Sequence, residues 1–316
     1  MTRLHRRFKA VGPAFLVCLA MLSASPVETA KPFEAWTAPV NLGEDVNSAF
    51  NDFLPELSSN GLSLYFASNR PGPFGGEDLW VSRRASRDAR WGTPVNLGTL
   101  VNTSFNERSP ALSRDGHLLF FASDRPGGAG SLDIWVSWRA HTHDDFAWQP
   151  AVNLGTGVNG AAGDFGPSYF ENDEIGIPNL FFASSRPGGV GGVDIYRSEL
   201  LPSGSFGPAS SIPVLNAPEN DFRPTIRPDG LELIFDSSRP GPPDVSGLGL
   251  RDLWVSARSS VSAPWSTPEN LGSVVNGAFN DMLAALSSDG EMLVFTSDRP
   301  EGFGGNDLYI TTRSGR

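Results

Sequence analysis

Residues 54–72 read LPELSSNGLSLYFASNRPG, and they indicate the fold more clearly than any other part of the chain. Its turn signal, Asn60-Gly61, has an extended segment on either side, 54–58 before it and 63–68 after it. In LSLYFAS, alternate side chains are expected on opposite faces of a sheet. The Arg-Pro-Gly that follows ends the second segment in a loop. The stretch therefore predicts two antiparallel strands joined by a tight turn.

The same stretch occurs five times, each time inside a longer unit. A phrase built on an aromatic residue, proline and asparagine, such as WTAPVNLG, precedes it, and a strand-like segment such as DLWVSRR follows it. The first unit thus holds four extended segments, strands A to D, at 54–58, 63–68, 78–83 and 91–97. Four antiparallel strands repeated around an axis are the blades of a β-propeller. The phrase begins at Trp36, Trp91, Trp148, Phe206 and Trp265.

The two ends of the chain indicate how the ring closes. The fifth unit ends at Arg313 without a strand D, whereas the chain starts with an unmatched copy of that strand at 36–42. Pairing the two removes the exposed sheet edges. The sequence therefore predicts an all-β, five-bladed β-propeller of four-stranded antiparallel blades. We expect the N-terminal outer strand to complete the last blade and close the ring.

The pattern P-x-L-S-x-D-G-x-x-L-x-F-x-S-[ND]-R-P-G-G resembles the TolB-type, Pro-Asp propeller repeat of exported bacterial proteins. The resemblance covers residues 36–313. It implies the propeller fold and an exported location. It implies no catalytic residue, because proteins with this repeat include periplasmic interaction partners, envelope-associated proteins and enzymes acting on carbohydrates or peptides.

The N-terminal 30 residues have the order of a secretory signal peptide. Basic residues from Arg3 to Lys9 precede an apolar run that ends near Leu22, and small residues follow. We place the cleavage between about residues 24 and 30 and assign 31–316 to a single propeller domain, periplasmic or secreted. The only cysteine, Cys18, lies in the removed part, so no disulfide is expected.

Charge excludes one class of partner. The formal net charge is −11, and Lys31 is the only lysine after the signal segment. Nucleic-acid binding needs clustered basic residues, which this chain lacks. The apolar run is too short for membrane insertion. The remaining candidates are an envelope or extracellular protein and a glycan, bound by a monomer.

Ten charged positions recur in every unit. Five arginines follow strand B, and five aspartates begin strand C after a glycine-rich loop. We expect an Arg–Asp clamp across each B–C loop or from one blade to the next, since guanidinium and carboxylate pair well. Five ligand sites are the alternative. The positions are Arg70, Arg125, Arg186, Arg239 and Arg299, with Asp78, Asp133, Asp194, Asp252 and Asp307.

We predict no cofactor, although three features of the sequence had to be considered. The glycine-rich loops lead into strands, whereas a phosphate-binding loop leads into a helix. Calcium at these loops remains an alternative because oxygen donors are near. His141 and His143 lie in a C–D hairpin without a third metal ligand that the sequence fixes.

A second set of carboxylates stands just before strand A. In a propeller the B–C and D–A loops share one face, here called the top face, and strand A is innermost. These acids should therefore surround the channel mouth, either as caps of loop N–H groups or as an acidic funnel for a cation or a polyhydroxylated ligand. They are Asp52, Glu107, Asp164, Asp221 and Asp281.

The units differ after these acids, and a function served once per molecule should appear as such a break. The differing residues, Phe53, Arg108, Phe165, Arg223 and Met282, predict an asymmetric pocket rim. The ligand-binding candidates are these rim residues together with the five acids. Unit three also has a longer A–B hairpin, and unit four has a longer B–C loop, 239–252, which is placed to cover the opening.

The expected function is a binding or interaction scaffold that takes its ligand or partner on the top face. No histidine is placed there for a Ser-His-Asp hydrolase. The alternative is a carbohydrate-active enzyme, a glycoside hydrolase or lyase, that uses two carboxylates at the channel mouth. Two acids with raised pKa values in a closed pocket would favour the enzyme, whereas five similar capping acids would favour the scaffold.

Overall fold

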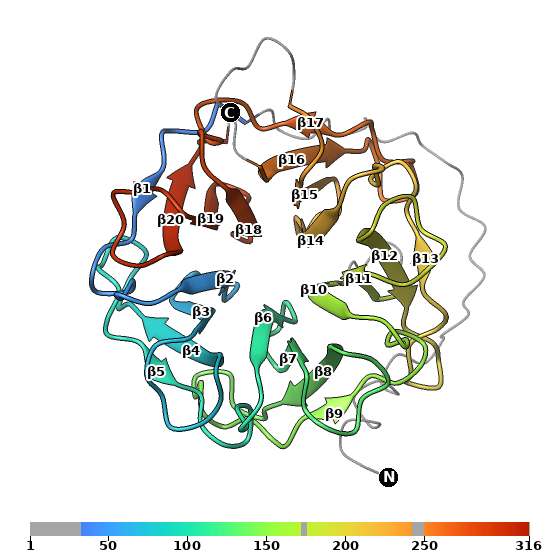
Figure 1. Ribbon diagram of the computed structural model, residues 1–316, viewed down its shortest axis with the longest axis horizontal. Coiled ribbons are helices and arrows are strands. Elements are labelled where there is room, and N and C mark those ends of the chain that lie inside the picture. The colour runs from blue at the N-terminus through green and yellow to red at the C-terminus, as the bar shows by residue number, and fades with distance from the viewer. Residues whose placement is uncertain (1–32, 172–175, 242–249, 316) are drawn as a thin grey trace, which may run out of the picture.

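Five four-stranded antiparallel sheets stand around a central axis in the computed structural model of the chain, as Figure 1 shows. The structure describes residues 33–171, 176–241 and 250–315. Blade 1 has the order β2-β3-β4-β5 from the axis outward, and the other blades repeat it. The predicted all-β, five-bladed fold is therefore confirmed. The predicted signal segment, and the parts of the two longer loops at 172–175 and 242–249, lie outside the described residues.

The strands fall close to the predicted segments, except that strand D pairs over only two residues. Blade 1 consists of β2 (Asp52–Leu57), β3 (Ser63–Ser68), β4 (Asp78–Arg83) and β5 (Val95–Asn96). Blade 2 consists of β6 (Glu107–Leu112), β7 (Leu118–Ser123), β8 (Asp133–Trp138) and β9 (Val152–Asn153). Blade 3 consists of β10 (Asp164–Phe170), β11 (Asn179–Ser184), β12 (Asp194–Glu199) and β13 (Ser210–Ser211). Blade 4 consists of β14 (Asp221–Ile226), β15 (Glu232–Ser237), β16 (Asp252–Ala257) and β17 (Glu269–Asn270).

The last blade is closed by the N-terminal part of the chain, as predicted. It consists of β18 (Asp281–Leu286), β19 (Met292–Ser297), β20 (Asp307–Thr312) and β1 (Val40–Asn41). β1 pairs antiparallel with β20, and Phe33 forms a further bridge to Gly315. The guanidinium of Arg313 stacks on the Phe33 and Trp36 rings at 3.8 and 4.3 Å from their centroids. These contacts join the two ends of the described chain.

In each blade, an asparagine side chain extends the pairing of the short outer strand. The Asn102 amide accepts from the backbone N–H of Leu79 and donates to its carbonyl, both at 2.9 Å, so it takes the place of a further paired residue. The corresponding asparagines, Asn47, Asn159, Asn216 and Asn276, make the same two bonds. This is the structural role of the recurrent Val-Asn or Leu-Asn pair.

The hydrophobic core lies between neighbouring blades. One cluster joins Tyr65 and Leu79 of blade 1 to Leu119 and Phe121 of blade 2, and Trp148 closes it with no exposed surface. Comparable clusters fill the other four junctions. Burying one such side chain contributes roughly 1.5–3 kcal/mol. Each blade is thus held mainly by its neighbours.

The B–C loop of one blade contacts the D–A loop of the next, so both loop sets share the top face as predicted. The N–H of Glu107, for example, donates to the carbonyl of Glu77 at 2.8 Å. A Cβ on Gly75 would stand only 1.7 Å from the carbonyl oxygen of Phe105, so glycine is required there. Over the described residues, no helix is long and apolar enough to cross a membrane.

Candidate ligand-binding site at the channel mouth

The five acids predicted just before strand A are the first residues of that strand and are sealed inside the loops. None has any exposed surface. Asp52 accepts from the N–H of Ser48 at 2.6 Å, from its hydroxyl at 2.8 Å, and from Arg70 at 2.5 Å. The other four accept a loop N–H and an arginine in the same way. The geometry is that of a cap, and an external ligand does not reach these carboxylates.

Two of these acids, Asp221 and Asp281, differ slightly in their electrostatics. Burial raises the pKa of both carboxyls above the usual range, against the lowering effect of their arginine partners and hydrogen bonds. Their contacts nevertheless match those of the other three, and neither is exposed. A raised pKa without access to a substrate does not make a catalytic acid.

The predicted arginine clamp exists, but its partner was wrong. Arg70, Arg125, Arg186, Arg239 and Arg299 pair with the acids before strand A, at distances between 2.5 and 3.0 Å. The reason is that each guanidinium also donates to the carbonyl of the D–A loop, Val46 in the case of Arg70, and stacks on core aromatics such as Trp80. The arginine is thereby drawn toward the D–A loop.

The aspartates that begin strand C hold the B–C loop instead. Asp133 accepts from the N–H groups of Ala129 and Gly130 and from the side chain of Asn153. Asp78, Asp194 and Asp307 likewise accept loop N–H groups, and Asp252 accepts from Asn270. All ten charges therefore belong to the frame. Within the described ranges, no group of three or more His, Cys, Asp or Glu could hold a metal ion.

The pocket rim differs from the predicted one at one position. The register pairs Phe222 with Asp236 as it pairs Phe53 with Ala67, so Phe222, not Arg223, follows the acid in blade 4. Arg223 lies one residue further along the strand. The rim therefore consists of Phe53, Arg108, Phe165, Phe222 and Met282, all half-buried.

Arg223 crosses the channel and closes it. It is 2% exposed and donates to the carbonyls of Leu283 and Pro110 at 3.1 Å, and to that of Pro55. These acceptors belong to blades 5, 2 and 1, so one side chain from blade 4 joins strands on several sides of the axis. The other four blades hold a left-handed residue here, with φ between 54° and 60°: Leu54, Ser109, Gly166 and Leu283.

Below Arg223 lies a carboxyl that is largely, but not fully, removed from solvent, with 19% of its side chain exposed. Glu56 is 3.9 Å from the Arg223 guanidinium and accepts from the N–H of Leu112 at 3.0 Å. Burial raises the pKa of Glu56 to about 7, although Arg223 lowers it, and burial lowers the pKa of Arg223 to about 10. Glu56 also lines a cavity of about 70 Å³ near the A–B hairpins, on the face opposite the mouth. Arg223 thus separates the mouth from this small cavity.

Above Arg223, blade 4 carries an ion pair that the sequence analysis missed. Asp236 replaces the small residue found at this place in the other blades, has no exposed surface, and pairs with Arg251. It also accepts from the N–H of Leu283 at 3.0 Å. The Arg251 guanidinium stacks on the Phe222 ring at 3.8 Å. The signal was readable as a break in the repeat, since FDS in unit four stands where other units have FAS or FTS.

A second ion pair lies on the side of blades 1 and 2. Arg108 contacts Glu77 at 2.7 Å, and their side chains are 33% and 23% exposed. Burial raises the pKa of Glu77, Arg108 lowers it, and the nearby Asp124 raises it. Glu77 is therefore a partly accessible carboxyl that favours its protonated form more than a free glutamate does.

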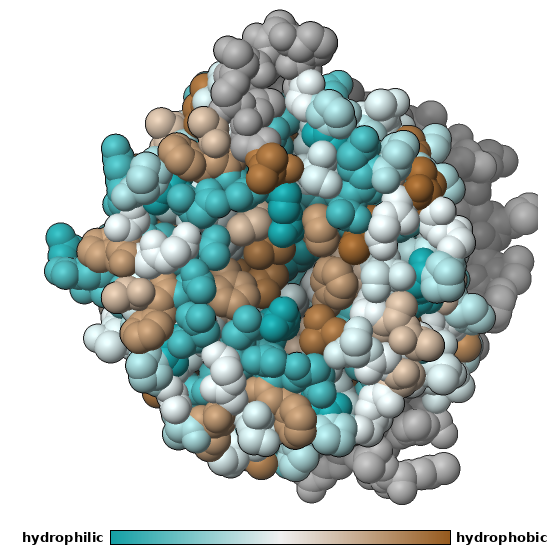
Figure 2. All heavy atoms as spheres, viewed as in Figure 1, coloured by the Kyte–Doolittle hydropathy of each residue, from teal (hydrophilic) through white to brown (hydrophobic). Residues whose placement is uncertain are grey.

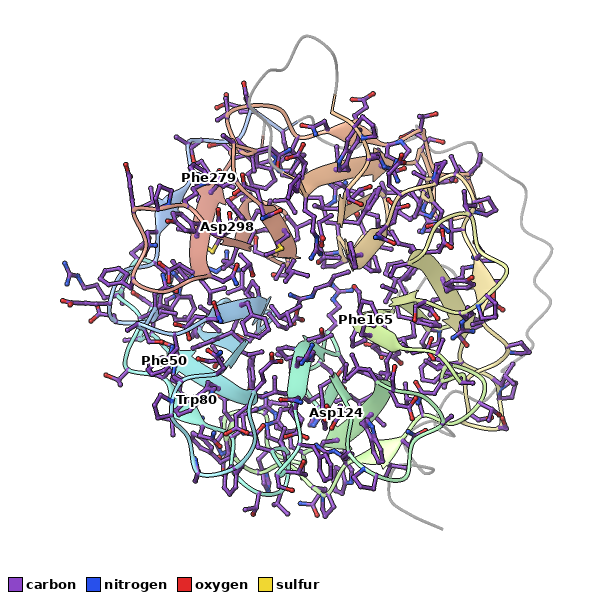
Figure 3. All side chains as sticks on the ribbon, in the orientation of Figure 1. Phe50, Trp80, Asp124, Phe165, Phe279 and Asp298 are labelled. Carbon is purple, nitrogen blue, oxygen red and sulfur yellow. The ribbon has the colours of Figure 1, made fainter. Side chains whose placement is uncertain are left out.

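These groups form one asymmetric opening. Figure 2 shows a hollow at the centre of the molecule, bordered by both hydrophobic and hydrophilic residues. Phe165 lies at its edge in Figure 3, with its ring centroid 6.4 Å from that of Phe222. We call this the channel-mouth site. It comprises Phe53, Glu77, Arg108, Phe165, Phe222, Asp236, Arg251 and Met282.

No known sequence family matches the chain, and no curated protein does. Solved propellers match its fold. The catalytic domain of a GH62 α-L-arabinofuranosidase from Coprinopsis cinerea is 13% identical, with a TM-score of 0.56 over 90% of this chain and 98% of that one. A GH43 endo-arabinanase from Bacillus licheniformis is 14% identical, with a TM-score of 0.55 over 84% and 95%. Likeness at this identity shows the fold alone.

A TolB candidate from Agrobacterium tumefaciens also matches, at 16% identity over 89% of this chain and 90% of that one. Its TM-score of 0.49 is too low to carry an argument. Membership of the TolB-type repeat family therefore stays a prediction from the repeated motif.

Proposed function

We propose that the chain is a carbohydrate-directed propeller that binds a saccharide at the channel-mouth site. The observation that carries the proposal is the side-by-side placement of Phe165 and Phe222 with the Arg251 guanidinium, which Asp236 holds, found once among the described residues. A sugar presents an apolar C–H face to an aromatic ring, and its hydroxyls donate to carboxylates and accept from guanidinium groups. The channel-mouth site offers all three kinds of group.

The mixture of charges favours a neutral polyhydroxylated ligand. Arg251 and Arg108 are each paired with a carboxylate, so the rim has no excess of positive charge for a phosphate or a polyanion. Among the structural neighbours, a GH62 hydrolase in complex with xylotriose and an arabinanase complexed with arabinobiose carry such ligands. In an exported protein, which the first 30 residues favour, such a site would meet glycans of the envelope or the medium.

Hydrolysis of a glycosidic bond is the second candidate, and Glu77 favours it. Such hydrolysis needs one carboxyl that is protonated and one that is ionised. Glu77, with its raised pKa and partial exposure, suits the general acid. The glycosidase activities of the structural neighbours support this candidate more than a protein-binding scaffold. The five sealed acids have no part in it.

Calorimetric titration with xylotriose, cellotriose and arabinobiose tests the proposal on the protein expressed from residue 31 onward. We expect one of them to bind, and Phe165→Ala and Arg251→Ala to weaken binding at least about tenfold, equivalent to ~1.4 kcal/mol. Phe146→Ala is the matched control, because this exposed phenylalanine lies in the C–D hairpin of blade 2 on the other face. Equal binding by all variants, or none by the parent, would overturn the proposal.

Release of reducing sugar from longer arabinan or xylan separates the two candidates. If the chain is a hydrolase, Glu77→Gln should abolish turnover and leave saccharide binding within about threefold, since glutamine keeps the shape of the side chain. Binding without any sugar release would leave the protein as a saccharide-binding propeller.

A further inference from the structure

The top face also loses its fivefold symmetry outside the channel mouth. The residue two places before each strand-A acid is a phenylalanine in blades 1, 2 and 5, but Ala162 in blade 3 and Glu219 in blade 4. Phe50, Phe105 and Phe279 are 42%, 39% and 38% exposed. The contacts between the loops of neighbouring blades involve only the backbone of these residues. The carbonyls of Phe50 and Phe105 face the glycines of the preceding blade's loop, and those of Ala162 and Glu219 do the same.

A second phenylalanine accompanies the first at two consecutive blade junctions. Phe303 precedes Gly304, which is packed against the carbonyl of Phe50, and Phe74 precedes Gly75, which is packed against that of Phe105. Phe303 is 48% exposed. The next junctions along the chain have Ala129 and Val190 at this place. The loops fold alike with either kind of side chain, so the fold does not require the aromatic rings.

Carboxylates accompany the phenylalanines in blades 2 and 5. Asp124 and Asp298 each accept from the N–H of the asparagine that follows the phenylalanine, at 2.8 Å. In blades 3 and 4, Ser185 and Ser238 accept the same N–H at 3.1 Å. A neutral side chain therefore suffices for the cap, as Asn69 also does in blade 1, and the negative charge is an addition in two of the three blades that carry phenylalanine.

These residues follow one another around the top face over blades 5, 1 and 2. Figure 3 places Phe279 and Asp298, then Phe50, then Asp124 along one side of the ring. The arc reaches the channel-mouth site, because Asp124 accepts from the side chain of Asn106 at 2.7 Å, and Asn106 packs against Gly76, the residue before Glu77. We call it the aromatic arc: Phe279, Asp298, Phe303, Phe50, Phe74, Phe105 and Asp124.

We propose that the aromatic arc binds an extended glycan chain that also enters the channel-mouth site, an inference that rests on the proposed function. The rings are half-exposed and separated along the face by polar loops, and Figure 2 shows hydrophobic patches interrupted by hydrophilic ones. A chain of sugars presents apolar faces and hydroxyls in alternation and fits that pattern. A protein interface of comparable size would need a contiguous apolar centre.

Chain length is the variable that tests the arc. Isothermal titration with xylo-, cello- and arabino-oligosaccharides of two to eight units should show affinity rising at least about tenfold between three and eight units in the parent. In Phe50→Ala/Phe105→Ala this rise should disappear, while trisaccharide affinity stays unchanged. Val190→Ala is the matched control, since this 50% exposed residue takes the place of Phe74 in blade 3. It should keep the full rise.

The outcomes for the arc and for the mouth are distinguishable. Trisaccharide binding whose strength is independent of chain length, or a length effect that survives in the double variant, would overturn the arc and leave the proposed function intact. Loss of the rise in both the double variant and Val190→Ala would also overturn it. Length-dependent binding that needs Phe50 and Phe105 but not Phe165 would support the arc and contradict the mouth. No binding of any oligosaccharide would overturn both.

Discussion

Replacing Arg223 tests how the channel is closed. In Arg223→Met the carbonyls of Pro55, Pro110 and Leu283 lose a charged donor, and Glu56 loses its neighbouring cation. A hydrogen bond to a charged group contributes about 1.5–3 kcal/mol, but the shortened side chain leaves room for water to satisfy some of the acceptors. We expect the free energy of unfolding to fall by about 3–5 kcal/mol, as for other buried pairs that lose one partner.

The assay is urea unfolding at pH 8, followed by tryptophan fluorescence. Arg114→Met is the matched control, because this exposed arginine lines the cavity on the other face and leaves the channel contacts intact. We expect the control to lie within about 0.5 kcal/mol of the parent. A loss below about 1 kcal/mol in Arg223→Met would refute the role of this side chain as the closure of the channel.

Three further predictions concern pH, the frame and the ring. Because the folded pKa of Glu56, about 7, exceeds its ordinary value of 4.5, the folded state holds this proton more tightly. Its contribution to stability is therefore present below pH 4.5 and is lost as pH rises to 7, by roughly 3 kcal/mol. Glu56→Gln should remove that loss, and unfolding at pH 5 and 8 that still differs as in the parent would contradict it. Arg125→Ala should destabilise by about 3–5 kcal/mol, since it leaves the buried Glu107 unpaired; a melting temperature equal to the parent's would exclude the clamp. Trp36→Ala should lower the unfolding free energy by about 3 kcal/mol, as for other large aromatic truncations, and amide exchange in β20 should accelerate more than in β8; equal acceleration would count against closure by the N-terminal strand.

The fold was predictable because every repeat carries the same local structural signals. Four of the five units carry an Asn-Gly or Asp-Gly turn, and all five carry the same apolar strand B followed by Arg-Pro, so the copies indicate the same structure independently. The closure by β1 was predictable from the number of strands, because the fifth unit lacks a strand D and the chain starts with an unmatched one. The exposure of individual charges did not follow, because an acid that caps a loop and an acid that lines a funnel have the same spacing along the chain.

The site was predictable only where a break in the repeat was aligned correctly. Phe53, Arg108, Phe165 and Met282 were placed at the rim, whereas Arg223 was placed there in error. Strand A contains a bulge between its second and fifth residues, and that irregularity decides which side chain enters the channel. Asp236 was overlooked, although it is the only acid at its strand-B position. The partner of the arginine clamp depends on contacts between loops that no local pattern encodes.

A crystal structure of the protein with xylotriose or cellotriose is the most direct test of the central claim. We predict a sugar ring packed on Phe165 and Phe222 above Arg223, with hydroxyls in contact with the Arg251 guanidinium. A saccharide bound instead at the Glu56 cavity on the opposite face, with the mouth empty, would contradict it.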